Sequence, residues 1–241
     1  MARTVLVTGA SRGIGAAVAR AFAAQGDRVA VHATTAERAR EAGVGDVAVG
    51  ADLADPEAVR AMVDEAAAAL GRIDVVVNNA GVIVEHPIDT VSYEDWQAAW
   101  RRTIDVNLIG AANVCWCALR HMPDGGAIVN VASRGAFRGE PGQPAYGASK
   151  AGLIALGQSL ARSLGPLGIS VTAVAPGFVE TDMAADELAG EGGERRRAES
   201  PLGRVATPEE IAAAVLYLAS PEAVLASGTV LDVNGASYLR M

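Results

Sequence analysis

The chain has 241 residues, 51% of which are hydrophobic, and a formal net charge of −8. This length suffices for one large α/β domain whose core needs neither disulfide nor metal. The negative charge and the lack of basic runs argue against binding to nucleic acid or to anionic membranes. No segment has eighteen uninterrupted apolar residues, and no signal-peptide pattern follows Arg3, so we expect a cytoplasmic protein.

Short β-branched runs alternate with helix-forming segments along the chain. Strands are expected over residues 4–7, 28–31, 47–49, 74–77, 127–131, 169–174 and 229–233. Helices are expected over 16–24, 56–70, 145–164 and 208–219, with a long and possibly bent helix within 93–122. Several strands are apolar at every position, which indicates helices on both faces. The sequence therefore predicts a single Rossmann-type α/β domain, a doubly wound parallel sheet of about seven strands.

The segment 181–203 interrupts this pattern, because it is rich in Gly, Glu and Arg. We expect a mobile surface segment here. It could serve as a substrate lid, although a solvated loop without that role fits the composition almost equally well.

The two cysteines, Cys115 and Cys117, fall on different faces of an expected helix and are predicted to remain reduced. The three histidines, His32, His86 and His121, are isolated in the sequence and lack the spacing of metal ligands. We therefore expect no metal in the site.

A glycine-rich turn, TGASRGIG at residues 8–15, follows the first strand and leads into a helix. Glycines allow a tight turn and a close backbone approach, so that amides and the helix N-terminus can bind a pyrophosphate. A plain strand-to-helix turn is the alternative. The residues expected at the phosphates are Gly9, Ser11, Arg12, Gly13, Ile14 and Gly15.

The spacing of Gly9, Gly13 and Gly15 resembles the TGxxxGxG form of the short-chain dehydrogenase/reductase family. The resemblance covers nearly the whole chain, because NNAG at 78–81, Asn107, Ser133, YGASK at 146–150 and PG at 176–177 follow in the family's order. It implies an oxidoreductase that transfers a hydride between nicotinamide and a carbonyl or alcohol carbon. Within the family the chain looks most similar to the 3-oxoacyl-(acyl-carrier-protein) reductase or ketoreductase branch.

The end of the second strand favours NADP(H) as the cofactor. NAD-specific folds carry an acidic residue there for the ribose 2′-hydroxyl, whereas this chain reads His32-Ala33-Thr34-Thr35, and the resemblance places Ala33 at the acidic position. Arg12 could pair with a 2′-phosphate, and Thr34, Thr35 and His32 could add hydrogen bonds. The alternative is that Arg12 is solvated and the site accepts either cofactor.

The resemblance implies further cofactor contacts. Asp52 and Leu53 would flank the adenine, although Asp52 could equally cap the helix that begins at Pro56. The remaining residues would lie along the adenosine ribose (Asn79, Ala80, Gly81) and on the nicotinamide side (Pro176, Gly177, Val179, Thr181).

Tyr146 and Lys150 are four residues apart at the start of a helix, so both project from one face. This spacing alone is common by chance. The resemblance implies that Tyr146 gives a proton to the carbonyl oxygen in reduction and takes it back in oxidation. A phenol has a pKa of about 10, which the ammonium of Lys150 and a positive nicotinamide would lower. Lys150 could also bind the nicotinamide ribose.

Two more residues complete the implied catalytic set. Ser133 follows the fifth strand, and its hydroxyl can polarise the substrate oxygen; an ordinary loop serine is the alternative. Asn107 would support a water that relays protons near Lys150, or would be a helix-kinking amide.

The substrate is the least determined feature. A carbonyl compound carried on an acyl carrier or CoA is expected first, and a free ketone, sugar, steroid or secondary metabolite second. A non-catalytic cofactor-binding regulatory protein is a third reading. Near the site, Arg134, Arg138 and the arginines at 195–197 could engage an anionic substrate, although solvated loop charges are the more common case.

The resemblance also implies a homotetramer, paired through the helix within 93–122 and the helix that contains Tyr146. Trp96, Trp100 and Trp116 could anchor such an interface, and core packing explains them equally well.

Overall fold

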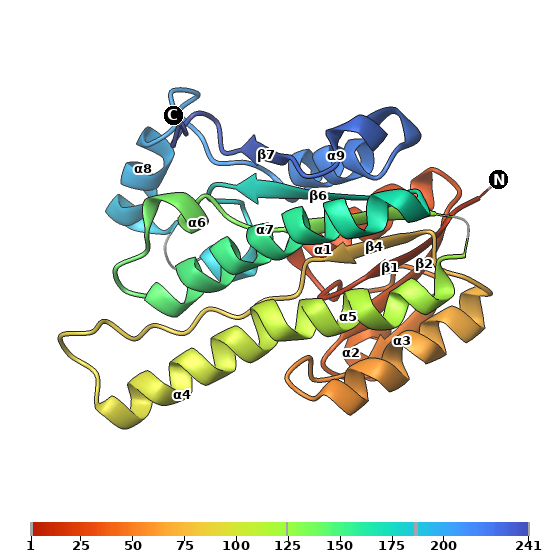
Figure 1. Cartoon of the computed structure of the whole chain (residues 1–241). Helices are drawn as coiled ribbons and strands as arrows, with labels where there is room; N and C mark the ends of the chain where they lie inside the picture. Colours follow the sequence, from red (N-terminus) through yellow and green to blue (C-terminus); the bar gives the residue numbers. More distant parts are fainter. Residues whose placement is uncertain (1, 124, 186–187, 241) are drawn as a thin grey trace.

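A computed structural model describes residues 2–123, 125–185 and 188–240. Within these residues the chain forms a seven-stranded sheet in the order β3-β2-β1-β4-β5-β6-β7 (Figure 1). Every neighbouring pair is parallel. The strands are β1 (Thr4–Val7), β2 (Arg28–Ala33), β3 (Val47–Gly50), β4 (Val75–Asn78), β5 (Gly126–Val131), β6 (Ile169–Pro176) and β7 (Val230–Val233). The predicted doubly wound parallel sheet is confirmed.

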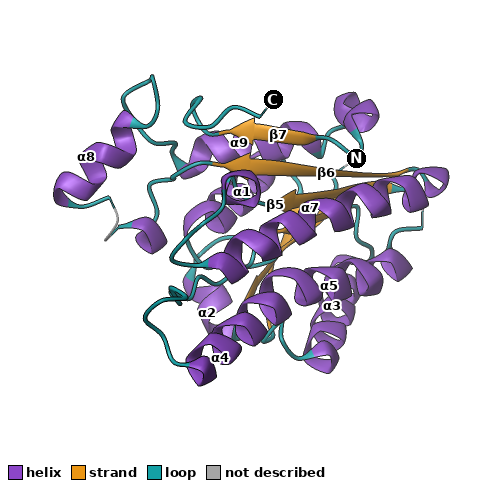
Figure 2. Ribbon diagram, turned by 60° about the vertical axis from the view of Figure 1, so that its left-hand side comes forward, coloured by secondary structure: helices purple, strands orange, loops and turns teal. Residues whose placement is uncertain are grey.

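Helices cover both faces of this sheet (Figure 2). They are α1 (Gly13–Ala24), α2 (Ala36–Glu41), α3 (Pro56–Leu70), α4 (Tyr93–Ile104), α5 (Ala111–Ala118), α6 (Gly135–Arg138), α7 (Pro144–Leu164), α8 (Gly190–Ala198) and α9 (Pro208–Leu218). The short helices α2, α6 and α8 were not expected from the sequence.

The core divides into two layers because successive strand residues face opposite sides of the sheet. Val5 and Val7 of β1 pack with α1 and α9 on one face, whereas Leu6 packs with α3 and α5 on the other. All four residues of β1 are buried. This double burial explains why the central strands carry apolar residues on both faces rather than at alternate positions.

Caps define the starts of α3 and α9. The side chain of Asp55 accepts from the amides of Glu57 and Ala58, so Asp55 caps α3 and the alternative role considered for Asp52 is wrong. Thr207 and Glu210 form a reciprocal capping box at the start of α9, ahead of Pro208.

The long helix expected within 93–122 is interrupted. α4 passes into a π-helical segment, Asp105–Gly110, before α5 begins, and a 3₁₀ turn, Leu119–His121, follows α5. π-Helical turns carry an extra residue and are frequent at functional sites. Gly110 lies in this segment, where an added Cβ would be 2.7 Å from the carbonyl oxygen of Leu53.

Among the described residues, no group of three or more His, Cys, Asp or Glu side chains is placed to hold a metal ion. No helix in the same ranges is long and apolar enough to cross a membrane. Cys115 and Cys117 are both free and buried, and burial raises the pKa of the Cys115 thiol to about 11.

The turn between β1 and α1 permits a packing test. A Cβ at Gly15 would contact the carbonyl oxygen of Gly9 and lie 2.5 Å from Asn79 Nδ2. We expect Gly15→Ala to lower the free energy of unfolding by about 1–3 kcal/mol in urea titrations, as overpacking does. Gly142→Ala is the matched control, because Gly142 has a φ outside the left-handed region, open space around it and no proline after it. Equal stability of the two variants would contradict this packing.

Candidate active site

The candidate residues meet at the carboxyl edge of the sheet, where open α/β folds bind ligands. Figure 1 shows this edge as the side to which the arrowheads point and on which α6 and α8 lie. The glycine turn follows β1, Asn79–Gly81 follow β4, Ser133 follows β5, and Gly177 follows β6. Tyr146 and Lys150 enter from the first turns of α7.

Lys150 is the only lysine in the chain, beside nineteen arginines. Its side chain is buried, and Nζ donates to the carbonyl oxygen of Val131 at 2.9 Å. Nζ lies 5.7 Å from the ring centroid of Tyr146. Burial lowers the pKa of Lys150 to about 8, because an ammonium loses hydration energy inside the protein.

Ser133 and Tyr146 are partly exposed, in contrast to Lys150. Ser133 Oγ accepts from the amide of Gly135 at 3.0 Å, which fixes the hydroxyl oxygen while leaving its proton for another acceptor. A partly open serine and phenol beside a buried ammonium provide hydrogen-bond donors for a substrate oxygen.

Asn107 is buried within the π-helical segment. Its Oδ1 accepts from the amide of Val82 at 2.8 Å, and its Nδ2 donates to the Val82 carbonyl oxygen and to Ser149 Oγ. The side chain therefore joins the loop after β4 to α7, one residue from Lys150. An added Cβ at Gly81 would lie 3.4 Å from both Asn107 Oδ1 and Lys150 Nζ, so the three residues form one tight cluster. The proton-relay water stays a prediction.

The glycine turn is held against the loop after β4. Thr8 Oγ1 accepts from the amides of Asn79 and Ala80, and Asn79 Nδ2 donates to the carbonyl oxygens of Thr8 and Gly9. An added Cβ at Gly9 would lie 2.7 Å from the Cα of Ala80. These contacts leave no room for larger side chains at the turn.

The same turn fits a cofactor pyrophosphate. Arg12, the N-cap of α1, makes no side-chain hydrogen bond to the first turn, which leaves the N-terminal amides for an anion. Ser11, Gly13 and Ile14 at this terminus are only partly buried. Across the turn, Thr181 Cγ2 would lie 3.3 Å from a Cβ at Gly13, so the loop after β6 closes the other side.

His32 does not have its expected place. Its Nδ1 accepts from the amide of Gly9 at 3.1 Å, and its Nε2 donates to the carbonyl oxygen of Ala51 at 3.0 Å. The side chain is 2% exposed, and burial lowers its pKa, so the ring is neutral. The expected hydrogen bond from His32 to a 2′-phosphate is therefore wrong. Instead, His32 stabilises the glycine turn by accepting from the Gly9 amide.

Sequence reasoning missed Arg38, which lies beside the end of β2. Thr35 caps α2 through the amide of Arg38, and Arg38 Nη1 lies 3.4 Å from Thr34 Oγ1. The signal was present as a capping threonine followed by Glu37 and Arg38, but α2 was not expected.

Arg12 is two-thirds exposed, and its guanidinium lies 4.0 Å from the carboxylate of Asp182.

Asp52 is paired with Arg102, a partner that sequence reasoning also missed. Arg102 Nη1 donates to both carboxylate oxygens, at 2.9 and 2.8 Å, and the amide of Ala54 donates to Oδ1. The Ala54 amide and Arg102 lower the pKa of Asp52 below its ordinary value. Leu53 is buried in the core beside α3.

The nicotinamide-side residues lie where β6 leaves the sheet. Pro176 ends β6, and a Cβ at Gly177 would lie 3.1 Å from Asn234 Cβ. Val179 is buried and forms a parallel bridge with Ala206.

The segment 181–203 is more structured than expected. It contains α8, and Ser200 at its end is buried; residues 186–187 lie outside the described ranges. Arg134 is not a solvated loop charge either, because it is 3% exposed and bonded to Glu199.

The chain is similar to known proteins along nearly its whole length. The family model described as enoyl-(acyl carrier protein) reductase matches residues 9–236. The 3-oxoacyl-(acyl-carrier-protein) reductase FabG of Staphylococcus aureus is 39% identical, over 99% of both chains. 3β-Hydroxysteroid dehydrogenase 1 of Eggerthella lenta is 41% identical, over 98% of this chain and 94% of its own.

A solved structure shows the same architecture. A short-chain dehydrogenase from Burkholderia cenocepacia, crystallised in complex with NADP, superposes with a TM-score of 0.88 at 37% identity, over 98% of this chain and 97% of its own. The glycine turn, the site at the carboxyl edge and these matches together show that the chain belongs to the short-chain dehydrogenase/reductase family, as an oxidoreductase.

Proposed function

We propose that the protein is an NADPH-dependent ketoreductase whose first substrate class is a 3-oxoacyl thioester. The observation that carries the proposal is the buried Lys150 ammonium beside the partly open Tyr146, at the edge where Ser133 is also partly exposed. An acid, an oxygen-binding hydroxyl and a cation in this arrangement suit proton transfer to a carbonyl oxygen.

Residues of the glycine turn and of α7 would bind the cofactor at its pyrophosphate and at its nicotinamide ribose. Gly13, Ile14 and Gly15 present backbone amides to the pyrophosphate, and Lys150 lies within the cluster expected to meet the nicotinamide ribose. When bound, the reduced nicotinamide supplies the hydride that the carbonyl carbon accepts.

The chain's own part is to bind the substrate oxygen and to move one proton. The Ser133 hydroxyl donates a hydrogen bond to the carbonyl oxygen, and the Tyr146 phenol transfers its proton to that oxygen as negative charge develops there. The nearby Lys150 ammonium stabilises the resulting phenolate. In the oxidative direction, the same phenolate takes the proton from the alcohol.

Three observations support NADP(H) over NAD(H). Ala33 ends β2 without a carboxylate, and the guanidinium of Arg38 lies beside Thr34 at that end. Arg12 is exposed on the neighbouring turn. A ribose 2′-phosphate would meet two guanidiniums and two threonine hydroxyls, a set suited to charge-assisted hydrogen bonds.

A second candidate function is the oxidation or reduction of a free steroid or sugar. It is favoured by the 41% identity to the Eggerthella lenta hydroxysteroid dehydrogenase and the 37% identity to an L-rhamnose 1-dehydrogenase of Azotobacter vinelandii. A regulatory protein without turnover would not need Ser133, Tyr146 and Lys150 together, which argues against that reading.

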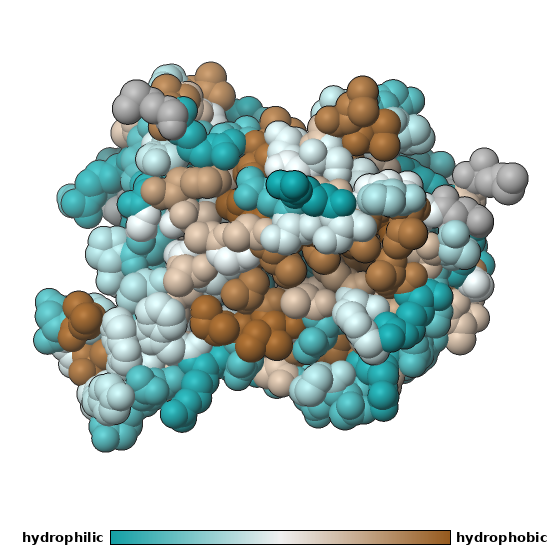
Figure 3. Space-filling model, in the orientation of Figure 1, coloured by the Kyte–Doolittle hydropathy of each residue, from teal (hydrophilic) through white to brown (hydrophobic). Residues whose placement is uncertain are grey.

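We also propose a cytoplasmic homotetramer. Exposed apolar residues support two contact surfaces: Ile109 and Trp116 on the π-helix and α5 side, and Tyr217, Leu225 and Leu231 on the α9 and β7 side. Figure 3 shows hydrophobic residues gathered along α5 and α7. Trp96 and Trp100 instead pack against His86 within the chain. A mass of about four chains by light scattering is the expected result.

The reaction is tested with a substrate panel. We expect NADPH oxidation with acetoacetyl thioesters, and a fall in kcat of about a hundredfold or more in Tyr146→Phe, because the phenylalanine cannot donate a proton. NADPH binding, measured by fluorescence, should persist in this variant. Turnover of free ketones without thioester turnover would reject the first substrate class, and full activity of Tyr146→Phe would reject the mechanism.

Cofactor preference is tested at the end of β2. We expect kcat/KM to be higher with NADPH than with NADH, and Ala33→Asp to reduce the NADPH value by at least about tenfold through charge repulsion. Arg38→Gln should lower it as well, with NADH use unchanged. Equal kcat/KM for the two cofactors in the unmutated protein would contradict the assignment.

A further inference from the structure

Three arginines converge on one carboxylate, that of Glu199 at the end of α8. Arg134 Nη2 lies 2.5 Å from Glu199 Oε2, Arg138 Nη1 lies 3.3 Å from the same oxygen, and Arg196 Nη1 lies 3.0 Å from Oε1. These hydrogen bonds hold the pKa of Glu199 below its ordinary value against the opposing effect of burial. The carboxylate is therefore charged at neutral pH.

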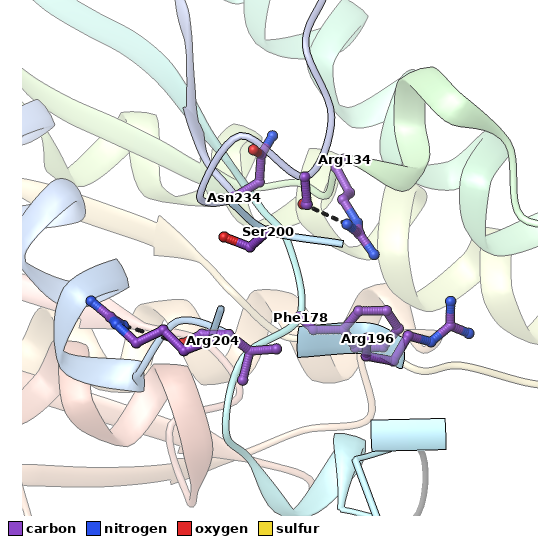
Figure 4. A pocket seen from close by; sticks show the side chains of 8 residues that line it. Arg134, Phe178, Arg196, Ser200, Arg204 and Asn234 are labelled. Carbon is purple, nitrogen blue, oxygen red and sulfur yellow. Dashed lines mark hydrogen bonds between the residues drawn. The ribbon is translucent and has the colours of Figure 1, made fainter. Parts of the chain in front are cut away.

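Arg134 is buried on several sides. Besides Glu199, its guanidinium donates to Ser237 Oγ and lies 5.0 Å from the ring centroid of Phe178. The guanidinium of Arg196 lies 4.6 Å from the same ring. Figure 4 shows Arg134 and Arg196 reaching Phe178 from different elements. Cation–π contacts of this kind strengthen when the cation is desolvated.

This cluster joins the parts of the site that would surround a substrate. Arg134 follows Ser133 directly, and its amide donates to the carbonyl oxygen of Pro176 at 2.9 Å. Phe178 follows Gly177 on the nicotinamide side, and Glu199 ends the helix of segment 181–203. Arg134 thus connects the Ser133 loop to the end of α8 through Glu199, and to the loop after β6 through its amide and its contact with Phe178.

The hollow beside the cluster is not a second ligand site. It is lined by Arg134, Phe178, Arg196, Ser200, Arg204, Val205, Asn234 and Ser237. Its guanidiniums already have carboxylate partners, because Arg134 and Arg196 bind Glu199 and Arg204 binds Glu210. The arginines therefore act on protein groups.

A buried ion pair contributes little net stability, since apolar residues of the same volume often serve equally well. Its hydrogen bonds are directional, however, and they fix where the two partners lie. The ion pairs of Glu199 with Arg134 and Arg138 join the end of α8 to the loop and short helix that follow Ser133, so the position of that end depends on Glu199.

We propose that Glu199 is a positioning residue for the substrate. Through Arg134 it holds the end of α8 against the Ser133 loop, so that α8 forms a wall of the substrate site. This inference rests on the proposed ketoreductase function for its kinetic readout. It assigns Glu199 to substrate fit, and neither to proton transfer nor to cofactor binding.

The test compares Glu199→Gln with Glu194→Gln, an exposed glutamate on the same helix. We expect Glu199→Gln to raise KM for the ketone about tenfold while kcat changes less. The reason is that displacing a wall of the site weakens substrate binding more than it slows the chemical step. The NADPH Kd should stay within about twofold. Amide hydrogen exchange in Gly190–Ala198 should accelerate in Glu199→Gln only.

In Glu199→Gln the buried guanidinium of Arg134 loses its carboxylate partner. A second variant covers the case in which this loss unfolds the protein. Arg134→Met combined with Glu199→Leu removes both charges and should restore stability, yet KM should remain raised because the directional bonds are lost. An unchanged KM in both variants would overturn the proposal, as would equal losses in kcat, NADPH affinity and stability.

The proposed ketoreductase function and the proposed role of Glu199 can each be rejected without the other. If the unmutated protein reduces no carbonyl on the panel, the proposed function is wrong, while hydrogen exchange in α8 still tests the Glu199 anchor. If the protein is active and exchange in α8 is the same in Glu199→Gln and Glu194→Gln, the anchor is wrong and the proposed function stands.

Discussion

The site depends on one unfavourable arrangement: an ammonium group held inside the protein. Lys150 is buried, its Nζ donates to the Val131 carbonyl oxygen, and desolvation lowers its pKa to about 8. Such a group is poorly hydrated and would be stabilised by any negative charge that develops nearby. A phenolate on Tyr146, whose ring centroid is 5.7 Å away, would provide that charge. The burial that destabilises the Lys150 ammonium would thus also favour ionisation of the Tyr146 phenol, so both follow from one electrostatic interaction.

The surrounding loops are arranged to maintain this burial. Asn107 joins the loop after β4 to α7, and a Cβ added at Gly81 in that loop would lie 3.4 Å from Nζ. The π-helical turn places Asn107 where a regular helix would rotate it away. On the other side, His32 and Asn79 fix the glycine turn through its backbone. Thr8, Asn79, His32, Asn107 and Lys150 all bond to backbone, which makes a rigid frame for a cofactor.

The sequence predicts the sheet well because the signals there are local and strong. Central strands carry apolar residues on both faces, and Pro56 and Pro208 mark helix starts directly. The site's outline was also predictable, since the motifs follow strands whose carboxyl ends must share an edge. What sequence could not provide was pairing across the chain: Arg102 meets Asp52 from fifty residues away, and Glu199 meets Arg134 from sixty-five. His32 was misplaced because an inward-facing histidine at a strand end looks the same in sequence as an outward-facing one.

The most direct measurement is the pKa of the Lys150 amine. Because the chain has a single lysine, labelling with ¹³Cε- and ¹⁵Nζ-lysine gives one side-chain NMR signal that needs no assignment. The burial of Nζ predicts that this signal titrates near pH 8 in the cofactor-free protein, with the ammonium lost as pH rises through that value. A midpoint near 10.5, the ordinary value, would show that Lys150 is hydrated and would contradict the account.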